Sequence, residues 1–290
     1  MKRTVLLTAE WPASLPRPME WGSEPELIGP RHLYRVGLVA RVLTRHLPRA
    51  ADPRGTATAR RPRVLDAGAG RGTLAVELAR RGYAVAAVEE SERFVAYLRS
   101  RGAAEPGARL AVARGDVTAL PFGSAAFDGI VCGEVLEHVD ADAAAMAELA
   151  RVLRPGGVLV ATVPAGRGRY GWLDRWAGHA RRYERDELDR LATRSGLRVE
   201  RLHHWGFPFG AAYERLIQRP VLARHARAGA PPTLALRLGR ARPVTRALGL
   251  LFALDRLCDR LPWGPSLLLV ARKASARAPN ALAAAAADPG

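Results

Sequence analysis

Three acidic residues of this chain stand where a side chain is well placed to bind a polar ligand. Asp66, Glu89 and Asp116 each lie at or just past the end of a short apolar run. A carboxylate accepts hydrogen bonds from hydroxyl and amino groups, and bonds to a charged acceptor are the stronger kind. The three acids together are therefore suited to a ligand that presents several hydrogen-bond donors.

A glycine-rich turn follows the first of these acids. Gly68, Gly70 and Gly72 alternate with other residues and precede a helical pattern over 73–81. Glycine lets the backbone turn sharply and approach a ligand closely, and the free N–H groups at a helix N-terminus favour electron-rich ligand atoms. The order of strand, turn and helix predicts a ligand-binding loop.

The nearest alternative for this turn is a dinucleotide-binding loop of the G-x-G-x-x-G/A type. In that pattern the third position is small, whereas this chain has Thr73 there. Asp66 also occupies a position where that pattern usually has an apolar strand residue. The turn alone does not decide between the two ligands, so the downstream segments carry the argument.

Strands and helices alternate through the chain and predict the scaffold for these residues. Strand patterns begin at Val64 and cover 84–88, 110–113, 127–132, 158–163, 197–202 and 266–270. Helical patterns cover 31–47, 73–81, a stretch capped by Ser91, a stretch capped by Asp140, and 186–194. Such alternation favours right-handed crossovers and an α/β fold with a doubly wound, mostly parallel seven-stranded sheet. Ligands bind such sheets at the carboxyl ends of the strands, where Asp66, Glu89, Asp116 and Gly133 are expected to meet.

Changes in composition divide the 290-residue chain into segments. The predicted segments are an N-terminal arm and helix (1–48), a linker (49–62), a core (63–205), a helical insertion (206–263), a final strand (264–273) and a disordered tail (274–290). The insertion precedes the last strand, and three roles remain open for it: covering the active site, lying on a membrane surface or packing on the body.

The net charge of +17 raises the question of a nucleic-acid partner. Only two of the 45 basic residues are lysines, Lys2 and Lys273, and the arginines are scattered singly and in pairs. This distribution indicates a solvated basic surface more than a nucleic-acid site, although attraction to anionic substrates or membranes remains open.

The cysteine count and the hydropathy of the chain indicate the cellular compartment in which it is expected. The two cysteines, Cys132 and Cys258, form no disulfide framework, and no apolar run approaches the ~18 residues of a membrane span. The sequence predicts a cytoplasmic protein with peripheral membrane contact as an option. No His, Asp or Glu cluster has metal-ligand spacing, so no metal site is predicted.

Five stretches, taken together, resemble the class I S-adenosylmethionine-dependent methyltransferases, and within them the type 11 group that includes quinone-biosynthesis enzymes. These stretches are Val64-Leu-Asp-Ala-Gly-Ala-Gly-Arg-Gly72, Val88-Glu-Glu-Ser91, Gly115-Asp-Val-Thr-Ala-Leu-Pro-Phe122, Phe127-Asp128 to His138, and Arg151-Val-Leu-Arg-Pro-Gly-Gly157. The resemblance spans about 64–163 and implies a Rossmann-like fold with S-adenosyl-L-methionine as the cofactor.

The resemblance also implies roles for individual residues. Glu89 would accept hydrogen bonds from the ribose hydroxyls, Asp116 from the adenine amino group, and the Val117 N–H would bind a ring nitrogen. The implied cofactor-binding set is Asp66, Gly68, Gly70, Gly72, Glu89, Asp116, Val117, Cys132 and Gly133.

Histidines are the candidates for proton handling, because the pKa of imidazole lies near neutral pH. The run His179-Ala-Arg-Arg-Tyr-Glu184 is similar to a recurrent element of the family and lies after the fifth strand, so His179 is the first catalytic candidate. His138 is the second, and His203 and His204 are weaker. The alternative is that His138 is structural and that the residues after His179 only anchor the loop.

The function that follows is methyl transfer to an oxygen, carbon or nitrogen of a small-molecule or lipid-like acceptor. A nucleic-acid (RNA) methyltransferase is an alternative, but Gly133-Glu134-Val135-Leu136 is not the Asn/Asp-Pro-Pro-Tyr/Phe element that grips a flipped base. A non-enzymatic protein that keeps the cofactor fold is the other alternative, since a fold alone does not give the reaction.

Overall fold

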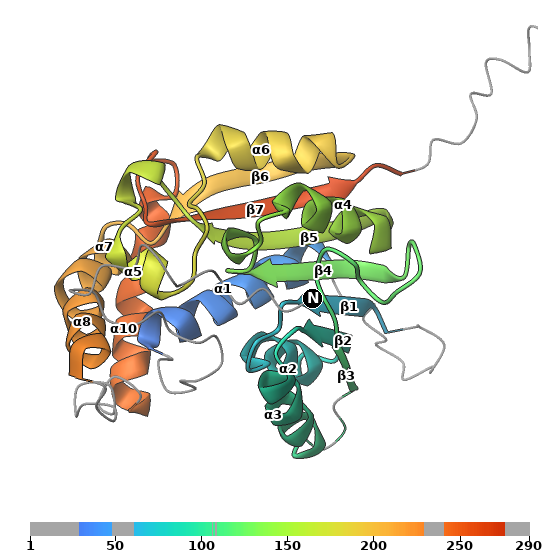
Figure 1. Ribbon diagram of the computed structural model, residues 1–290, viewed down its shortest axis with the longest axis horizontal. Helices are drawn as coiled ribbons and strands as arrows, with labels where there is room; N and C mark the ends of the chain where they lie inside the picture. Colours follow the sequence, from blue (N-terminus) through green and yellow to red (C-terminus); the bar gives the residue numbers. More distant parts are fainter. Residues whose placement is uncertain (1–28, 48–60, 106, 108, 229–240, 276–290) are drawn as a thin grey trace, which may run out of the picture.

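A seven-stranded sheet forms the centre of the molecule in a computed structural model, which describes residues 29–47, 61–105, 107, 109–228 and 241–275 (Figure 1). The strands are β1 (Arg63–Ala67), β2 (Ala84–Glu89), β3 (Leu110–Arg114), β4 (Phe127–Gly133), β5 (Leu153–Pro164), β6 (Leu197–Trp205) and β7 (Ser266–Lys273). Their order is β3-β2-β1-β4-β5-β7-β6. All pairs from β3 to β5 are parallel, and β7 runs antiparallel between β5 and β6. The predicted fold class is confirmed.

Helices cover both faces of this sheet and extend beyond one end of it (Figure 1). They are α1 (Pro30–His46), α2 (Thr73–Arg80), α3 (Glu92–Ala103), α4 (Asp142–Val152), α5 (Trp172–Trp176), α6 (Arg185–Arg194), α7 (Phe209–Tyr213), α8 (Arg219–Ala228) and α10 (Arg242–Leu254). Side chains alternate between the faces along each strand, so Leu65 packs with α4 and α6 while Val64 packs with α1 and α2. The two apolar layers fix the sheet between the helices.

Helix α1 forms where the apolar spacing predicted a helix over 31–47. Val36, Val39, Ala40 and Leu43 recur at three- and four-residue intervals and are buried against the sheet. Pro30 starts the helix, at a position where its missing N–H costs nothing. Because its apolar stripe lies along the sheet, the first turns of α1 reach the edge where the parallel strands end.

Several predicted boundaries differ from the structure. Asp140 is not the N-cap residue of α4, because Ala141 occupies that position. Ser91 does cap α3, with its hydroxyl 3.4 Å from the Phe94 nitrogen. Strand β5 begins at Leu153, before the strand predicted over 158–163, and its pairing with β4 shifts register between Phe127 and Gly129. Most of the arm and linker and nearly all of the tail lie outside the described residues.

Between β6 and β7 the described residues are helical. Helix α7 continues into a π-helical segment (Glu214–Gln218) and α8, and α10 continues into a short 3-10 helix (Asp255–Cys258). Figure 1 shows α8 and α10 together at one end of the molecule, beyond the sheet. Within the described residues, no helix is both long enough and apolar enough to cross a bilayer.

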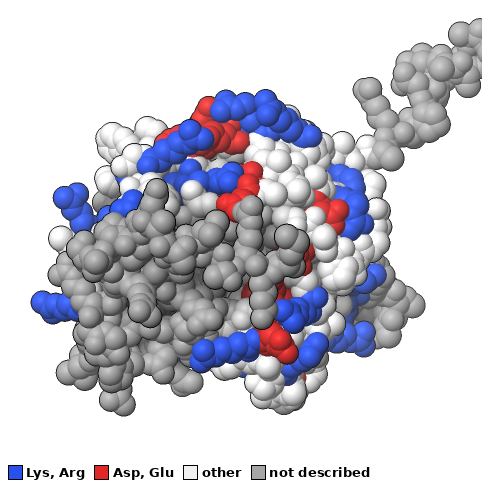
Figure 2. Space-filling view, viewed as in Figure 1, with Lys and Arg blue, Asp and Glu red and all other residues white. Residues whose placement is uncertain are grey.

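Basic and acidic side chains are mixed on the surface seen in Figure 2. On α6, for example, Arg190 pairs with Asp186 at 2.7 Å, and Glu187 of the same helix pairs with Arg167. The described part of this face therefore shows no unbroken basic block of the kind that binds a nucleic-acid backbone.

Candidate active site

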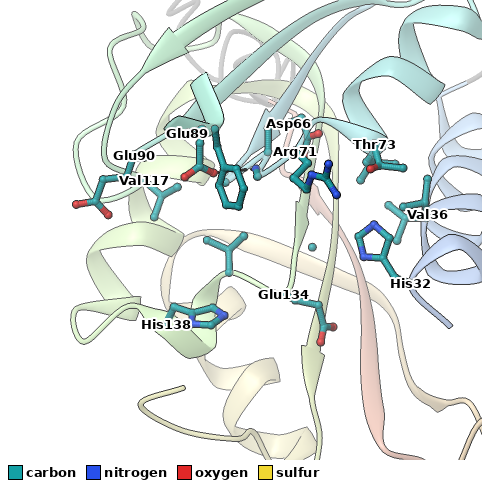
Figure 3. A pocket seen from close by; sticks show the side chains of 18 of the residues that line it. His32, Val36, Asp66, Arg71, Thr73, Glu89, Glu90, Val117, Glu134 and His138 are labelled. Carbon is teal, nitrogen blue, oxygen red and sulfur yellow. Dashed lines mark hydrogen bonds between the residues drawn. The ribbon is translucent and has the colours of Figure 1, made fainter. Parts of the chain in front are cut away.

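A cavity of about 370 Å³ opens at the carboxyl ends of β1, β2 and β4. Its walls include seven of the nine residues predicted to bind cofactor, together with one predicted catalytic histidine: Asp66, Gly68, Gly70, Glu89, Asp116, Val117, Gly133 and His138. In Figure 3, Asp66 and Glu89 lie on one side of this space, and Glu134 and His138 lie on the other. Residues that are far apart in sequence thus surround one cavity.

The loop between β1 and α2 is shaped by its glycines. The N–H groups of Gly68 and Ala69 both donate to the carbonyl oxygen of Val88, at 2.9 Å each, which folds the loop over the end of β2. Gly68 and Gly72 have φ values of 71° and 70°, in the left-handed region. A Cβ on Gly68 would lie 2.4 Å from Val135, and one on Gly72 would lie 1.6 Å from Leu98. Gly72 does not line the cavity, so it serves close packing of the loop against α3.

Alanine at Gly72 should therefore destabilise the protein far more than alanine at Gly70. Gly70 also has positive φ, 52°, but a Cβ there meets nothing within 4 Å. Gly70→Ala should cost about 1–2 kcal/mol of unfolding free energy from backbone conformation alone, and Gly72→Ala should cost at least about 1–3 kcal/mol more from overpacking. Urea denaturation of the two variants measures the difference, and equal losses would contradict the packing role.

Glu89 is held by the backbone around it. Its carboxylate accepts hydrogen bonds from the Gly70 N–H at 2.8 Å and from the Ser91 N–H at 2.9 Å. Burial raises the pKa of Glu89 and the backbone donors oppose that rise. The carboxylate is thereby fixed at the cavity wall with its orientation set by two strand-end loops.

Asp66 has an unpartnered oxygen at the cavity. The side chain is 2% exposed, and within the described residues its Oδ2 has no hydrogen-bond partner. Burial raises its pKa to about 7, against a backbone hydrogen bond from Ala75. An unpaired carboxylate oxygen in a cavity wall is costly unless a ligand donates to it. A cationic or hydrogen-bond-donating ligand would remove this cost.

Asp116 and Val117 line the cavity from the loop after β3. The Oδ1 atom of Asp116 accepts a hydrogen bond from the Thr118 N–H at 2.7 Å, which fixes the side chain in a tight turn. Val117 is buried and adds an apolar wall beside it. This corner therefore combines an oriented carboxylate with an apolar surface, as a planar base with an amino group requires.

Helix α1 supplies a wall of the cavity that no sequence pattern predicted. His32, Arg35, Val36 and Val39 all line the cavity. Arg35 lies 3.2 Å from Glu134 and 3.0 Å from His32 Nδ1. Burial lowers the pKa of Arg35 to about 10 and that of His32 to about 3, so the guanidinium stays charged and the imidazole neutral near pH 7. Arginines in an amphipathic helix are common, and no local spacing set Arg35 apart.

The Cys132 side chain does not line the cavity, and the role predicted for the backbone around Cys132 and Gly133 stays a prediction. Along β4 alternate side chains face opposite sides, so Gly133 lines the cavity while Cys132 enters the apolar core beneath α4. Burial raises the pKa of the Cys132 thiol well above its usual range. The thiol is therefore a packing group.

The two histidine candidates lie next to each other. His138 lines the cavity, whereas His179 lies behind it with its ring centroid 4.7 Å from that of His138. His179 Nδ1 is 2.9 Å from Asp174 Oδ1, and His138 Nδ1 is 3.1 Å from the Gly178 carbonyl oxygen. Each contact uses the Nδ1 atom and so fixes the orientation of the ring, with the Nε2 atom on its opposite side. Burial, and then the charge of His179, lower the pKa of His138 to about 3.

A buried carboxylate completes this cluster. Glu137 is 0% exposed, and neither of its carboxylate oxygens has a hydrogen-bond partner within the described residues. Burial raises its pKa to about 8. One ligand-type atom each from Glu137, His138 and His179 lie within 4.8 Å of one another, a separation at which such groups could share a proton or hold a metal ion. Local spacing gave no sign of this group because His179 is distant in sequence.

The residues after His179 tie their loop to the body. The Tyr183 hydroxyl donates to the Leu136 carbonyl oxygen at 3.1 Å and contacts Asp142 at 2.8 Å, where Arg181 also pairs. Arg182 pairs with Asp174 at 2.7 Å. The anchoring expected of these residues is present, and it holds His179 against His138.

The weaker candidates His203 and His204 do not line the cavity. His203 lies 3.5 Å from Asp259, and His204 lies 3.3 Å from the Gly264 carbonyl oxygen. Both contacts belong to the packing between β6 and the segment before β7.

Comparison with known families agrees with this geometry. Residues 65–161 match the family described as "Methyltransferase domain". These residues therefore form a methyltransferase domain of the class I S-adenosylmethionine-dependent type. The matched region runs from within β1 to within β5 and includes every cavity residue except those of α1.

Relatives and solved structures resemble this chain over different lengths. A demethylmenaquinone methyltransferase from Beutenbergia cavernae is 40% identical over 98 residues, 34% of this chain and 39% of that protein. A ubiquinone biosynthesis O-methyltransferase from Methylocella silvestris is 35% identical over 131 residues, 44% of this chain and 50% of that protein. The chain thus spans half or less of these two relatives. A structure from Galdieria sulphuraria, described as a sarcosine dimethylglycine methyltransferase, has a TM-score of 0.59 at 19% identity and covers 84% of this chain and 86% of its own.

Proposed function

We propose that this protein transfers a methyl group from S-adenosyl-L-methionine to an oxygen or carbon of a small-molecule or lipid-like acceptor; a nitrogen acceptor is a variant of the same proposal. One observation carries the proposal: acids and glycines from the ends of β1, β2, β3 and β4 line a single cavity in which Asp66 keeps an unpartnered oxygen. A cofactor with an ammonium group, ribose hydroxyls and an adenine amino group has donors for each of these acids.

Different residues of the cavity would bind the ribose, the adenine and the methionine part of the cofactor. Glu89 would accept from the ribose hydroxyls, and Asp116 and Val117 would hold the adenine. Asp66 would face the ammonium group of the methionine part, and Arg35 and Arg71, which both line the cavity, are cations that could bind its carboxylate. When bound, the cofactor supplies an electrophilic methyl group on a sulfonium, so the protein mainly orients the acceptor and excludes water.

His138 and His179 would handle the proton of the acceptor. His138 lines the cavity opposite Glu89, and His179 lies behind it against Asp174. An oxygen or carbon acceptor loses a proton as it takes the methyl group, and a neutral imidazole can accept one. His138 would contact the acceptor and pass its proton on to His179, because burial lowers the pKa of His138 and its imidazole does not retain a proton near pH 7.

Cofactor binding should depend on pH through Asp66. Its pKa is about 7 in the free protein because burial favours the neutral form. A cationic ammonium group favours the ionised form, so affinity should rise as pH increases through about 7 and binding should release protons. Calorimetry in buffers of different ionisation enthalpy measures that release. Asp66→Asn should bind weakly with little proton release, whereas release unchanged in Asp66→Asn would assign it to another group.

The acceptor class follows from the surroundings of the site. Val36, Val39, Val135 and Val139 give the cavity apolar walls, which suits an acceptor with an apolar body. The similar proteins named above carry quinone-pathway names, and quinones reside in lipid. We infer a lipid-like acceptor reached from the cytoplasmic side by peripheral contact with a membrane.

Two measurements test the proposed function. Calorimetry should detect binding of S-adenosyl-L-methionine, and cofactor labelled on its methyl group should transfer label to a small extractable molecule in cell extracts. Label in RNA would favour the nucleic-acid alternative, as would salt-sensitive RNA affinity. Tight cofactor binding without transfer to a broad range of acceptors would favour a non-enzymatic protein, and absence of cofactor binding would contradict the proposal.

A further inference from the structure

The segment from α10 to the start of β7 exposes an unusual set of side chains. Every exposed residue of 243–263 is apolar or an arginine. The large apolar members include Leu250, Leu254 and Leu257, whose exposed fractions are 74%, 50% and 84%, and Trp263, which is 54% exposed. We call the exposed apolar residues of this segment, its two prolines excepted, the α10 stripe: Val244, Ala247, Leu250, Leu251, Leu254, Leu257, Leu261 and Trp263.

The α10 stripe has the spacing of one helical face. Its members from Val244 to Leu261 follow at intervals of mostly three or four residues, which places them along one side of α10 and the turn that continues it. The inner side of α10 is apolar as well, because Phe252 is buried against Tyr34 and Tyr213. Packing in the described fold therefore accounts for one face of this helix and leaves the other exposed.

The charges beside the α10 stripe have one sign. Arg246, Arg256 and Arg260 are exposed. The two acids of the segment are engaged elsewhere: Asp255 accepts hydrogen bonds from the backbone of Phe209 and Gly210, and Asp259 pairs with Arg201 and His203. A surface of exposed leucines, a tryptophan and arginines without exposed acids complements an anionic lipid surface.

A second copy of the chain fits this face less well. Pairing two α10 stripes would bring arginines of both copies together. The exposed part of the segment offers no carboxylate to neutralise them, and like charges in close contact disfavour association. A bilayer of anionic lipids has no such conflict, because its headgroups carry the opposite charge.

The α10 stripe also lies close to the proposed acceptor site. Helix α1 stands between them: His32 and Arg35 face the cavity, and Tyr34 lies 5.7 Å, ring centroid to ring centroid, from Phe252 of α10. Figure 1 shows α10 beside α1 at one end of the molecule. A membrane bound at the stripe would thus be one helix away from the cavity wall.

We propose that the α10 stripe and its three arginines bind the surface of an anionic bilayer, with the leucines and Trp263 inserted among the lipid headgroups. This inference rests on the proposed function only for the reason why the protein would bind a membrane, which is to bring a lipid-like acceptor to the cavity. Binding itself depends on the surface alone, so it can be tested without turnover.

Flotation of the full chain with lipid vesicles tests the proposal. The protein should float with vesicles of phosphatidylcholine and phosphatidylglycerol, and much less with phosphatidylcholine alone. Arg246→Gln/Arg256→Gln/Arg260→Gln should reduce binding on the order of 100-fold, since each arginine near an anionic surface contributes about a factor of five. Leu250→Ser/Leu254→Ser/Leu257→Ser should reduce it by about tenfold or more.

A control variant separates this surface from net charge. Arg99→Gln/Arg109→Gln/Arg194→Gln removes the same charge from exposed positions elsewhere and should bind nearly as the wild type. Leu257→Ser alone, at the most exposed position, serves if the triple leucine variant does not fold. The affinity for S-adenosyl-L-methionine should be unchanged in every variant. A wild-type protein that binds no cofactor would therefore contradict the proposed function and leave the membrane-binding proposal standing.

Three outcomes would overturn the proposal: no flotation of the wild type with anionic vesicles, equal loss in the control variant, or flotation that the leucine and arginine changes leave intact. A dimer that Leu257→Ser dissociates, without vesicle binding, would instead assign the stripe to a second copy.

Discussion

Replacing Glu89 by alanine is expected to weaken binding of S-adenosyl-L-methionine by about 1.5–3 kcal/mol, the value of a hydrogen bond to a charged partner. The carboxylate lines the cavity and is oriented by the backbone N–H groups of Gly70 and Ser91. Because those donors hold it in place before the ligand arrives, little entropy opposes its bonds to the ribose hydroxyls. Isothermal titration calorimetry measures the loss, which corresponds to roughly 10- to 150-fold in the dissociation constant.

Two further variants show whether the loss comes from the ligand contact. Glu92→Ala removes a carboxylate from the same stretch, but that side chain is 83% exposed and pairs with Arg114 instead of lining the cavity. It should leave affinity unchanged. Glu89→Gln keeps an oxygen acceptor and should fall between the wild type and Glu89→Ala. Unchanged affinity in Glu89→Ala would contradict the ribose role, and an equal loss in Glu92→Ala would point to a general effect of charge.

The sheet and one half of the cavity could be predicted because their signals are local. Each strand-end acid follows an apolar run directly, so Asp66, Glu89 and Asp116 could be placed at one edge once the strands were recognised as parallel. The same reasoning placed Gly133 correctly. It could not place the Cys132 side chain, because alternation along β4 sends neighbouring side chains to opposite faces and the sequence does not say which one faces the ligand.

The other half of the cavity depends on packing between distant segments. Arg35 and His32 reach it only because the buried stripe of α1 lies along the sheet. The group of Glu137, His138 and His179 exists because Tyr183 and Arg181 tie the loop after β5 to the start of α4. Neither arrangement has a local sequence pattern. The roles of all these residues remain predictions.

Replacing His179 by alanine is expected to lower turnover by about 10²- to 10⁴-fold, the usual contribution of general acid–base catalysis, and to leave cofactor affinity nearly unchanged. His179 does not line the cavity, so it would act through His138, whose ring centroid is 4.7 Å away. Removing it would interrupt proton transfer away from the acceptor. Steady-state kinetics gives turnover once labelling has identified an acceptor, and calorimetry gives the affinity. His204→Ala, at a partly buried histidine bonded to the Gly264 carbonyl oxygen, is the matched control.

A structural role for His179 would give a different pattern, which its contact with Asp174 makes testable. The imidazole is 2.9 Å from Asp174, whose pKa is lowered overall, because hydrogen bonds from His179 and Arg182 outweigh the effect of burial. His179→Asn can still donate to that carboxylate but cannot carry a proton at neutral pH. If His179 relays protons, the asparagine variant should be as slow as the alanine variant while its thermal stability recovers. If His179 only anchors the loop, asparagine should restore turnover and stability together, because Asp174 would again have its partner.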